Sequence, residues 1–415
     1  MKESNKALKY GFMLLMFYVY WSFIFSETIL TSSIARQIIS AFILFLFLLG
    51  LLNTIRKSRL PICYEGFLWI PFIVVTLVGL VFAGAINAIM FWIIAIIILI
   101  VASNVQLDSY FSPRQLAIFG VIAFVGILVQ MFFKSLYYNR LIYFFNDRTI
   151  SDIRAWSGHT GYAGFTYQLA MTAAILIGAE AAFYYFYFAS EKKKQKHVLM
   201  LACIICIFGV FLTGKRTMSL IALLTPVLIS VLSQKRTGKR LMYEFIIIGI
   251  IVGAYFFIVT NVNKLINTRA LGRIAESLVA LRAGDDFSNG RNALYTSAMT
   301  AFLQHPILGI GIDNFTEYTG QHTAVHNAYL QILCEQGIVG GILFIVPLTT
   351  GVVKSFKTLR TNLKTEKRAG VCLGIFFQIY FILYSFTGNT TSDLFGYIIY
   401  FLGLGLVISC RKSYE

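Results

Sequence analysis

"AIMFWIIAIIILIVAS", residues 88–103, carries no charged side chain and decides the fold class. A second such run, "FIIIGIIVGAYFFIVT", occupies residues 245–260. Of the 415 residues, 58% are hydrophobic and only 13% are charged, which is more apolar side chain than a soluble domain of this size can bury. Continuous apolar segments satisfy their backbone polar groups in lipid only as helices. The sequence therefore predicts an all-α polytopic membrane protein.

Apolar segments of bilayer length recur along the chain at spacings of roughly 20 to 35 residues. The first keeps its aromatic bulk and lacks a small-residue cleavage site, which indicates a span and not a removable signal peptide. The predicted regions are spans 1–9 in residues 1–260, an extracytoplasmic loop at 261–326 and spans 10–12 in 327–415. The twelve predicted spans are 10–26, 37–55, 66–84, 88–104, 115–134, 162–189, 198–213, 217–233, 241–260, 327–352, 370–387 and 393–410.

The net charge of +17 reflects basic loops that face anionic lipid headgroups, and it predicts a membrane partner and no nucleic acid. With both termini cytoplasmic, most of the 35 basic residues fall in short inner loops, as the positive-inside rule demands. Almost all the others gather in three outer places: 134–154, the turn "TGKRT" at 213–217 and the loop 261–326. This concentration suggests a function on the outer face that needs cations.

The long outer loop contains two predicted helices. "RALGRIAESLVALRAGDD", residues 269–286, has apolar residues at helical spacing and indicates an interfacial amphipathic helix. Ser288, Asn289 and Gly290 then provide helix-start chemistry for a helix over about 291–304 that ends before Pro306. Arg291 would lie at its N-terminal end, where free N–H groups and a guanidinium favour a phosphate.

"GVFLTGKRT", residues 209–217, nearly spells a phosphate-binding P-loop. Arg216 stands where that motif needs Ser or Thr, so the magnesium ligand is missing and we reject the nucleotide interpretation. What remains is a Lys215–Arg216 pair at the outer end of one span and the start of the next. No metal-ligand cluster stands out in the outer loops, and neither a metal nor another cofactor is expected.

"GQHTAVHNAYLQILCEQGIVGG", residues 320–341, places His322 and His326 at the outer mouth of the tenth span. Two or more cations with a neutral imidazole suit glycosyl transfer from a lipid pyrophosphate. The arginines would neutralise the leaving pyrophosphate, and the imidazole would take the proton of the acceptor hydroxyl. His326, held at the start of a helix, is the predicted catalytic base. Glu335 lies on the opposite helix face and is a poor candidate for orienting it.

A family resemblance rests on "NGRNALYTSAMTAFLQHPILGIGIDNF" (289–315) followed by "HNAYLQILCEQGIVGG" (326–341). A Gly-Arg before a loop helix, a His-Pro-x-x-Gly-x-Gly turn and a His-Asn-x-Tyr-Leu helix start resemble the O-antigen ligase and polymerase family. The resemblance implies the lipid-linked glycosyltransferase (GT-C-like) fold class and an inverting, metal-independent transfer. It further implies that Arg216 and Arg291 bind undecaprenyl pyrophosphate and that His326 is the base.

Supporting roles are predicted for other outer residues. Lys215 and Arg154 would add positive potential for the pyrophosphate, and sugar or acceptor contacts are predicted for His322, His159, Asn327 and Tyr329. The expected setting is the bacterial inner membrane, with the active site facing the periplasm. Undecaprenyl-pyrophosphate-linked oligosaccharide is the expected substrate, and a chain-length regulator is a further expected partner.

Three functions remain open at this point. The leading one is a polymerase of O-antigen or capsular polysaccharide repeats, favoured because Ala324 stands where ligases often carry a second histidine. The alternative is an O-antigen ligase that transfers the finished chain to lipid A core, in lipopolysaccharide synthesis. A flippase or transporter for the same lipid-linked sugar is the alternative of another class, but it should show mid-membrane ionisable residues and related halves.

Overall fold

The computed structural model describes residues 5–25, 33–57, 63–102, 107, 110–144, 150, 161–166, 169–232, 260–261, 272–283, 290–390 and 396–412. Every regular element in this part of the chain is helical. Seven of its helical segments are long and apolar enough to cross a membrane, and three shorter apolar helices accompany them. The protein is a multi-pass membrane protein, as the composition predicts.

Most of the predicted spans coincide with helices. The spans before residue 233 match α1 (Lys6–Phe25), α2 (Ser33–Lys57), α3 (Tyr64–Phe67) with α4 (Ile70–Phe82), α5 (Ile86–Ala102), α6 (Pro113–Phe132), α9 (Leu169–Ala189), α10 (Lys193–Leu212) and α11 (Arg216–Leu232). The last three match α17 (Ala328–Leu359), α18 (Thr365–Ser385) and α19 (Gly396–Lys412). The predicted span at 241–260 lies outside the described residues, except for its last position.

In the described part of the chain, five further helices, which match no predicted span, lie in the predicted outer loops. They are α7 (Lys134–Asn139) and the 3-10 helix η2 (Leu141–Phe144), then α14 (Gly272–Ala283), α15 (Arg291–Gln304) and α16 (Phe315–Thr319). α15 has the bounds that the sequence predicts for it. Its N-cap is Gly290, with φ 79° and no side-chain cap, whereas Ser288 and Asn289 lie outside the described residues.

One predicted boundary is wrong. The sixth span was expected to begin at residue 162, but α9 begins at Leu169. The chain turns before it at Gly164, where φ is 62°. The side chain of Gln130 accepts a hydrogen bond from the Gly164 N–H at 2.9 Å. Residues 162–168, "YAGFTYQ", carry no charge, so the absence of charge does not mark where the helix starts.

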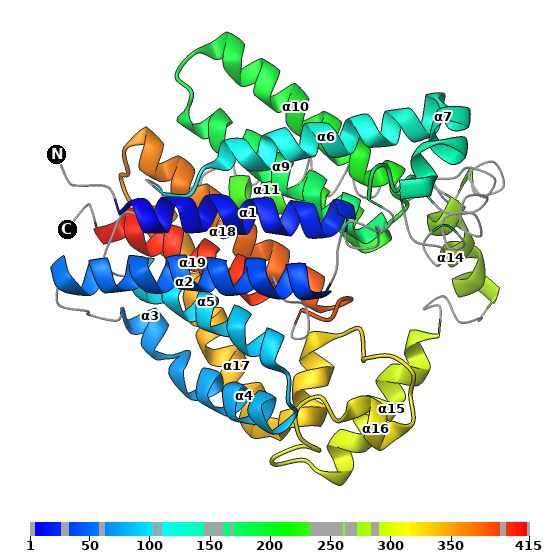
Figure 1. Ribbon diagram of the computed structural model, residues 1–415. Coiled ribbons are helices and arrows are strands. Elements are labelled where there is room, and N and C mark those ends of the chain that lie inside the picture. The colour runs from blue at the N-terminus through cyan, green and yellow to red at the C-terminus, as the bar shows by residue number, and fades with distance from the viewer. Residues whose placement is uncertain are drawn as a thin grey trace. The chain divides into compact units, whose positions relative to one another are not determined.

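The chain divides into two compact units, which are described separately. The first comprises Met1–Met13, Gln37–Phe111 and Ser288–Glu415, and the second comprises Leu14–Arg36 and Ser112–Phe287. In the first unit, α18 packs along α19, which also contacts α5, and α17 packs against α18 (Figure 1). In the second unit, α9 packs against both α6 and α10.

Aromatic rings fill the core of the first unit. The Trp69 ring is fully buried and lies in edge contact with Phe344 of α17 and Phe401 of α19, at centroid distances of 5.9 and 5.1 Å. Edge-to-face pairs of this kind stabilise beyond the burial of their area. Trp69, in the short connection between α3 and α4, therefore joins the third, tenth and twelfth predicted spans.

A buried carboxylate ties the same three segments together at their charged ends. Glu65 is 2% exposed and accepts two hydrogen bonds from Arg411, at 2.7 and 3.2 Å. Lys354 lies 3.3 Å from the same carboxylate, and its ammonium group also sits over the Tyr64 ring. The start of α3 and the last turns of α17 and α19 thus meet at one ionic cluster. That these three ends face the cytoplasm stays a prediction.

Glu65→Gln should lower the unfolding temperature of the purified protein in lipid. The substitution leaves two cations beside a neutral amide, and we expect a loss of about 1–3 kcal/mol because both cations remain partly solvated. The measurement is thermal unfolding, with Glu366→Gln in the first turn of α18 as the control. Equal unfolding temperatures for the two variants would show that the cluster stabilises nothing.

Candidate functional site

The N-terminal part of α17 contains a break. Gly337 has φ 64° and ψ −164°, far from helical values, nine residues after the helix begins at Ala328. Ile338 and Val339 therefore do not donate to the carbonyls of Cys334 and Glu335, which are their partners in a regular helix. Two N–H groups and two carbonyls are released, and in lipid an unsatisfied group costs several kcal/mol.

The turn that follows α15 binds all four released groups. The N–H of Ile338 donates to Pro306 O at 2.8 Å, and that of Val339 donates to Ile307 O at 3.3 Å. In return, the N–H groups of Ile310 and Gly311 donate to Cys334 O and Glu335 O, both at 2.9 Å. We call this arrangement, formed by residues 306–311 and 334–339, the turn–helix clamp.

Two glycines allow the clamp to close. A Cβ at Gly309 would lie 2.3 Å from the carbonyl carbon of Glu335, and one at Gly337 would lie 2.2 Å from Ile307 O. Both residues also have positive φ, which L side chains rarely adopt. The Glu335 side chain, which is 5% exposed, accepts a hydrogen bond from Gln331 at 3.2 Å.

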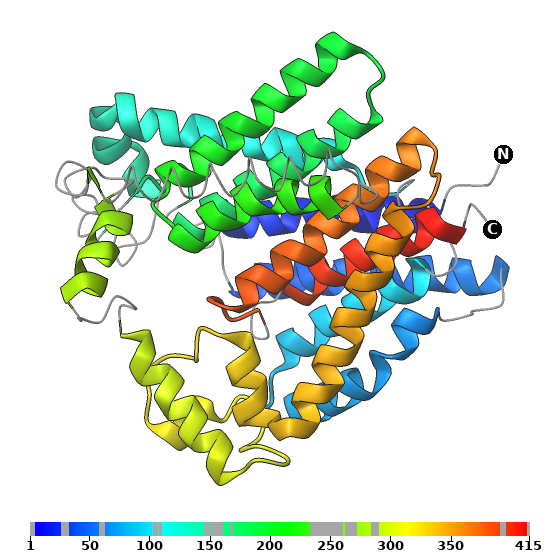
Figure 2. The same ribbon diagram turned by 180° about the vertical axis from the view of Figure 1, so that it is seen from behind.

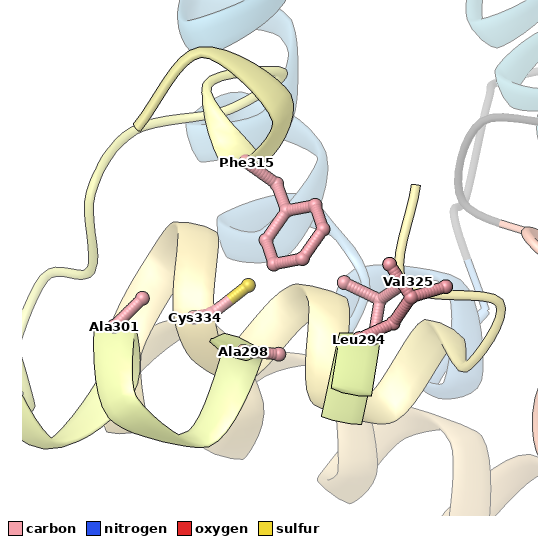
Figure 3. Close-up of a cluster of buried hydrophobic side chains, with 6 residues drawn as sticks. All are labelled: Leu294, Ala298, Ala301, Phe315, Val325 and Cys334. Atoms are coloured by element: carbon pink, nitrogen blue, oxygen red, sulfur yellow. The ribbon is translucent and has the colours of Figure 1, made fainter. Parts of the chain in front are cut away.

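An apolar cluster fixes α15 and the loop before α17 to this clamp. Figure 3 shows the Phe315 ring pointing between Cys334 of α17 and Val325, with Leu294 beside Val325. Ala298 and Ala301 of α15 complete the cluster, and their small side chains let α15 lie close to α17 (Figure 2). Leu294 is one turn after Arg291, and Val325 directly precedes His326. The cluster therefore brings the surroundings of these two predicted site residues together.

His326 is held in an unusual backbone conformation. Its φ is 57°, and it precedes Asn327, which is the N-cap of α17. The backbone N–H of His326 donates to Asn389 Oδ1 at 2.7 Å, and Asn389 Nδ2 lies 3.2 Å from His326 Nδ1. A left-handed backbone conformation costs a non-glycine residue about 1–3 kcal/mol, and it persists only where the surrounding structure imposes it. Buried Val325, the Asn327 cap and the Asn389 bond together impose it here.

The other predicted site residues of this unit differ in environment. Asn327 uses its side-chain oxygen to accept from the N–H groups of Tyr329 and Leu330, both at 3.1 Å. The Tyr329 hydroxyl donates to Ile382 O of α18 at 3.0 Å. Both side chains thus have structural partners, and sugar contacts by them stay predictions. His322 is exposed and lies five residues before the Asn327 cap. Arg291 is half-buried at the first position of α15.

Lys215 and Arg216 lie in the second unit. Arg216 begins α11, and the turn before it is shaped by Gly214, at φ 69°, and by Thr213, whose hydroxyl donates to Val210 O at 2.6 Å. Both basic residues are half-buried. That Arg216 meets Arg291 and His326 at one site stays a prediction.

Residues 161–166 brace this turn, a contact that the sequence pattern does not predict. The Tyr162 N–H donates to Leu212 O at 2.8 Å, and a Cβ at Gly161 would lie 2.0 Å from the carbonyl carbon of Thr213. The buried Tyr137 hydroxyl donates to Gly164 O at 2.6 Å. Burial raises the pKa of Tyr137 well above its ordinary value, so this donor persists throughout the physiological range. The glycines of "GHTGYAG" (158–164) were the available signal for such a close approach.

Two predicted site residues, Arg154 and His159, lie outside the described residues. Within the described part of the chain, no group of three His, Cys, Asp or Glu side chains is placed to hold a metal ion.

Comparison with known families bears directly on this region. Residues 201–345 match the family model described as O-antigen ligase. This segment is an O-antigen ligase family domain. It begins within α10 and includes the Lys215–Arg216 turn, α15, the turn–helix clamp and His326. The family assignment predicted from the sequence motifs is confirmed, and its members are membrane enzymes of polysaccharide assembly. No curated protein matches the chain.

Gly309→Ala and Gly337→Ala should each destabilise the protein severely. Each adds a methyl group against backbone at a positive φ, which we expect to cost about 2–5 kcal/mol. Gly320→Ala is the matched control, because its φ is 68° but nothing lies within 4 Å of an added Cβ. That variant should lose only about 1 kcal/mol. Thermal unfolding in lipid compares the three, and similar losses at all three positions would contradict the clamp.

Proposed function

We propose that the protein is a polymerase that joins undecaprenyl-pyrophosphate-linked oligosaccharide repeats into O-antigen or capsular polysaccharide on the periplasmic face of the bacterial inner membrane. The observation that supports it best is the placement of His326 and the start of α15 around one apolar cluster within an O-antigen ligase family domain. Polysaccharide assembly by this family also agrees with a chain that is mostly membrane helix.

The reaction assigns one task to each kind of side chain. A hydroxyl oxygen at the non-reducing end of one lipid-linked repeat bonds to the anomeric carbon of a growing chain. The bond from that carbon to the donor pyrophosphate breaks, and its electron pair leaves with undecaprenyl pyrophosphate. The hydroxyl proton passes to His326, which acts as the general base. Because the leaving group is already a stable anion, the transfer needs neither a nucleotide nor a protein nucleophile.

Arg216 and Arg291 are proposed to bind the pyrophosphate, and their local structures are alike. Each is the first residue of a helix, and each follows a left-handed glycine within two positions, Gly214 in one case and Gly290 in the other. Free N–H groups and the positive end of the helix dipole favour an anion there. A guanidinium adds a bidentate fork for phosphate oxygens. Lys215 and Arg154 are proposed to add positive potential, without direct contact.

O-antigen ligase activity is the second candidate, because the matching family model carries that description. A ligase would use the same donor and the same two arginines to bind its pyrophosphate, but its acceptor would be lipid A core. Ala324, at a place where ligases often carry histidine, favours the polymerase. The test supplies purified protein in vesicles with lipid-linked repeats alone. Chain growth supports the polymerase, and transfer only after lipid A core is added supports the ligase.

Arg291→Lys should reduce transfer on the order of 10- to 100-fold although the charge is kept, because lysine cannot form the bidentate fork. Arg216→Ala and Arg291→Ala should abolish polymer. Arg282→Ala is the control, since Arg282 is an exposed arginine in the last turn of α14 within the same predicted loop. The measurement is the length of the chains formed from lipid-linked repeats. Chains of normal length from Arg216→Ala would contradict the proposal that Arg216 binds the pyrophosphate.

His326→Ala should bind the donor lipid but transfer about 10²- to 10⁴-fold more slowly, the usual contribution of a positioned general base. His322→Ala, at an exposed position of the same loop where a sugar or acceptor contact is predicted, should weaken substrate binding but lower the rate of the transfer step far less. Donor binding and single-turnover transfer are measured separately for both variants. If His326→Ala transfers at the wild-type rate, His326 is not the base.

A further inference from the structure

Asn389 makes two contacts with one histidine from a distant part of the chain. It lies in the connection between α18 and α19, 63 residues after His326. Its Oδ1 accepts from the backbone N–H of His326 at 2.7 Å, and its Nδ2 lies 3.2 Å from the ring Nδ1. One amide group therefore fixes both the backbone and the ring of the proposed base.

The chemistry of the two contacts determines the proton position on the ring. A backbone N–H can only donate, so the atom that faces it must be the amide oxygen of Asn389. The amide nitrogen then faces Nδ1, and since an amide NH₂ can only donate, Nδ1 must accept. A neutral imidazole has one accepting nitrogen and one N–H. The lone pair is consequently on Nδ1, and the ring proton is on Nε2.

We propose that Asn389 is a positioning residue that keeps the lone pair of His326 on Nδ1, so that Nδ1 is the nitrogen that receives the proton of the acceptor hydroxyl. The mechanistic half of this proposal rests on the proposed function, whereas the proton position does not. A general base elsewhere often uses Nε2, with Nδ1 held by an acceptor. Asn389 reverses this arrangement, because it presents a donor to Nδ1.

The acceptor hydroxyl donates to Nδ1 in place of the Asn389 N–H, which has the same polarity. As the hydroxyl oxygen bonds to the anomeric carbon, its proton moves to Nδ1 and gives an imidazolium with N–H at both nitrogens. The electron pair of the breaking bond leaves with undecaprenyl pyrophosphate. The Asn389 amide disfavours a proton on Nδ1, so the ring returns that proton to water and becomes neutral again.

The proton position is tested by ¹⁵N NMR of the full chain in lipid, with labelled histidine and His326→Gln to assign the signal. Wild type should show an unprotonated Nδ1 and a protonated Nε2. The opposite pattern in the wild-type spectrum overturns the proposal, whether or not any variant folds and whether or not the protein is a polymerase.

Asn389→Asp tests the consequence for transfer. The carboxylate still accepts from the His326 backbone N–H, but it presents an acceptor to Nδ1 and should move the ring proton there. We expect the NMR pattern to reverse and transfer to fall about tenfold or more. Asn389→Ala, which frees the ring without reversing it, should lose less. Asn314→Asp is the charge control, at an exposed asparagine of the same unit whose side-chain amide donates to Ile310 O at 3.0 Å.

Two results distinguish a failure of this proposal from a failure of the proposed function. A reversed NMR pattern in Asn389→Asp with undiminished transfer overturns the assignment of Nδ1 as the base nitrogen. Full transfer by His326→Ala overturns the proposed function itself, and it leaves the proton position in the wild-type spectrum as an independent finding. An unchanged unfolding temperature shows that Asn389→Asp retains the fold.

Discussion

The structure of the first unit depends on the exchange of hydrogen bonds at the break in α17. Two helical bonds are lost at Gly337, and four bonds to residues 306–311 replace them. In lipid the released groups have no water to bind, so the turn and the broken helix are each costly without the other. The loop that contains α15 and α16 is thereby fastened to a membrane helix through backbone groups.

The position of His326 follows from that attachment. The clamp places α15 against the first turns of α17, and their shared apolar cluster buries Val325 beside the histidine. Asn327 then ends the loop by capping α17, and Asn389 reaches across from the far end of α18. The side chain that is proposed to move a proton is thus supported from three elements, which suits a group that must be held to within fractions of an ångström.

The sequence predicts much of this fold because the decisive signals are local. Apolar runs mark the spans, and Gly290, Arg291 and Pro306 bound α15 at its observed residues. The same local signals cannot show where backbone groups find partners elsewhere in the chain. The break lies at a glycine, and a glycine within a membrane helix is common. Asn389 likewise reads as an ordinary loop residue until the fold brings it to His326.

The glycines of the His-Pro-x-x-Gly-x-Gly motif acquire a physical meaning in this account. Gly309 lets the turn approach Glu335, and Gly311 donates to it, so these positions serve the clamp and not the chemistry. Hydrogen–deuterium exchange of the protein in lipid tests the clamp most directly. The amides of Ile310, Gly311, Ile338 and Val339 should exchange as slowly as those within α18. Exchange as fast as that of the exposed residues 316–318 would contradict the account.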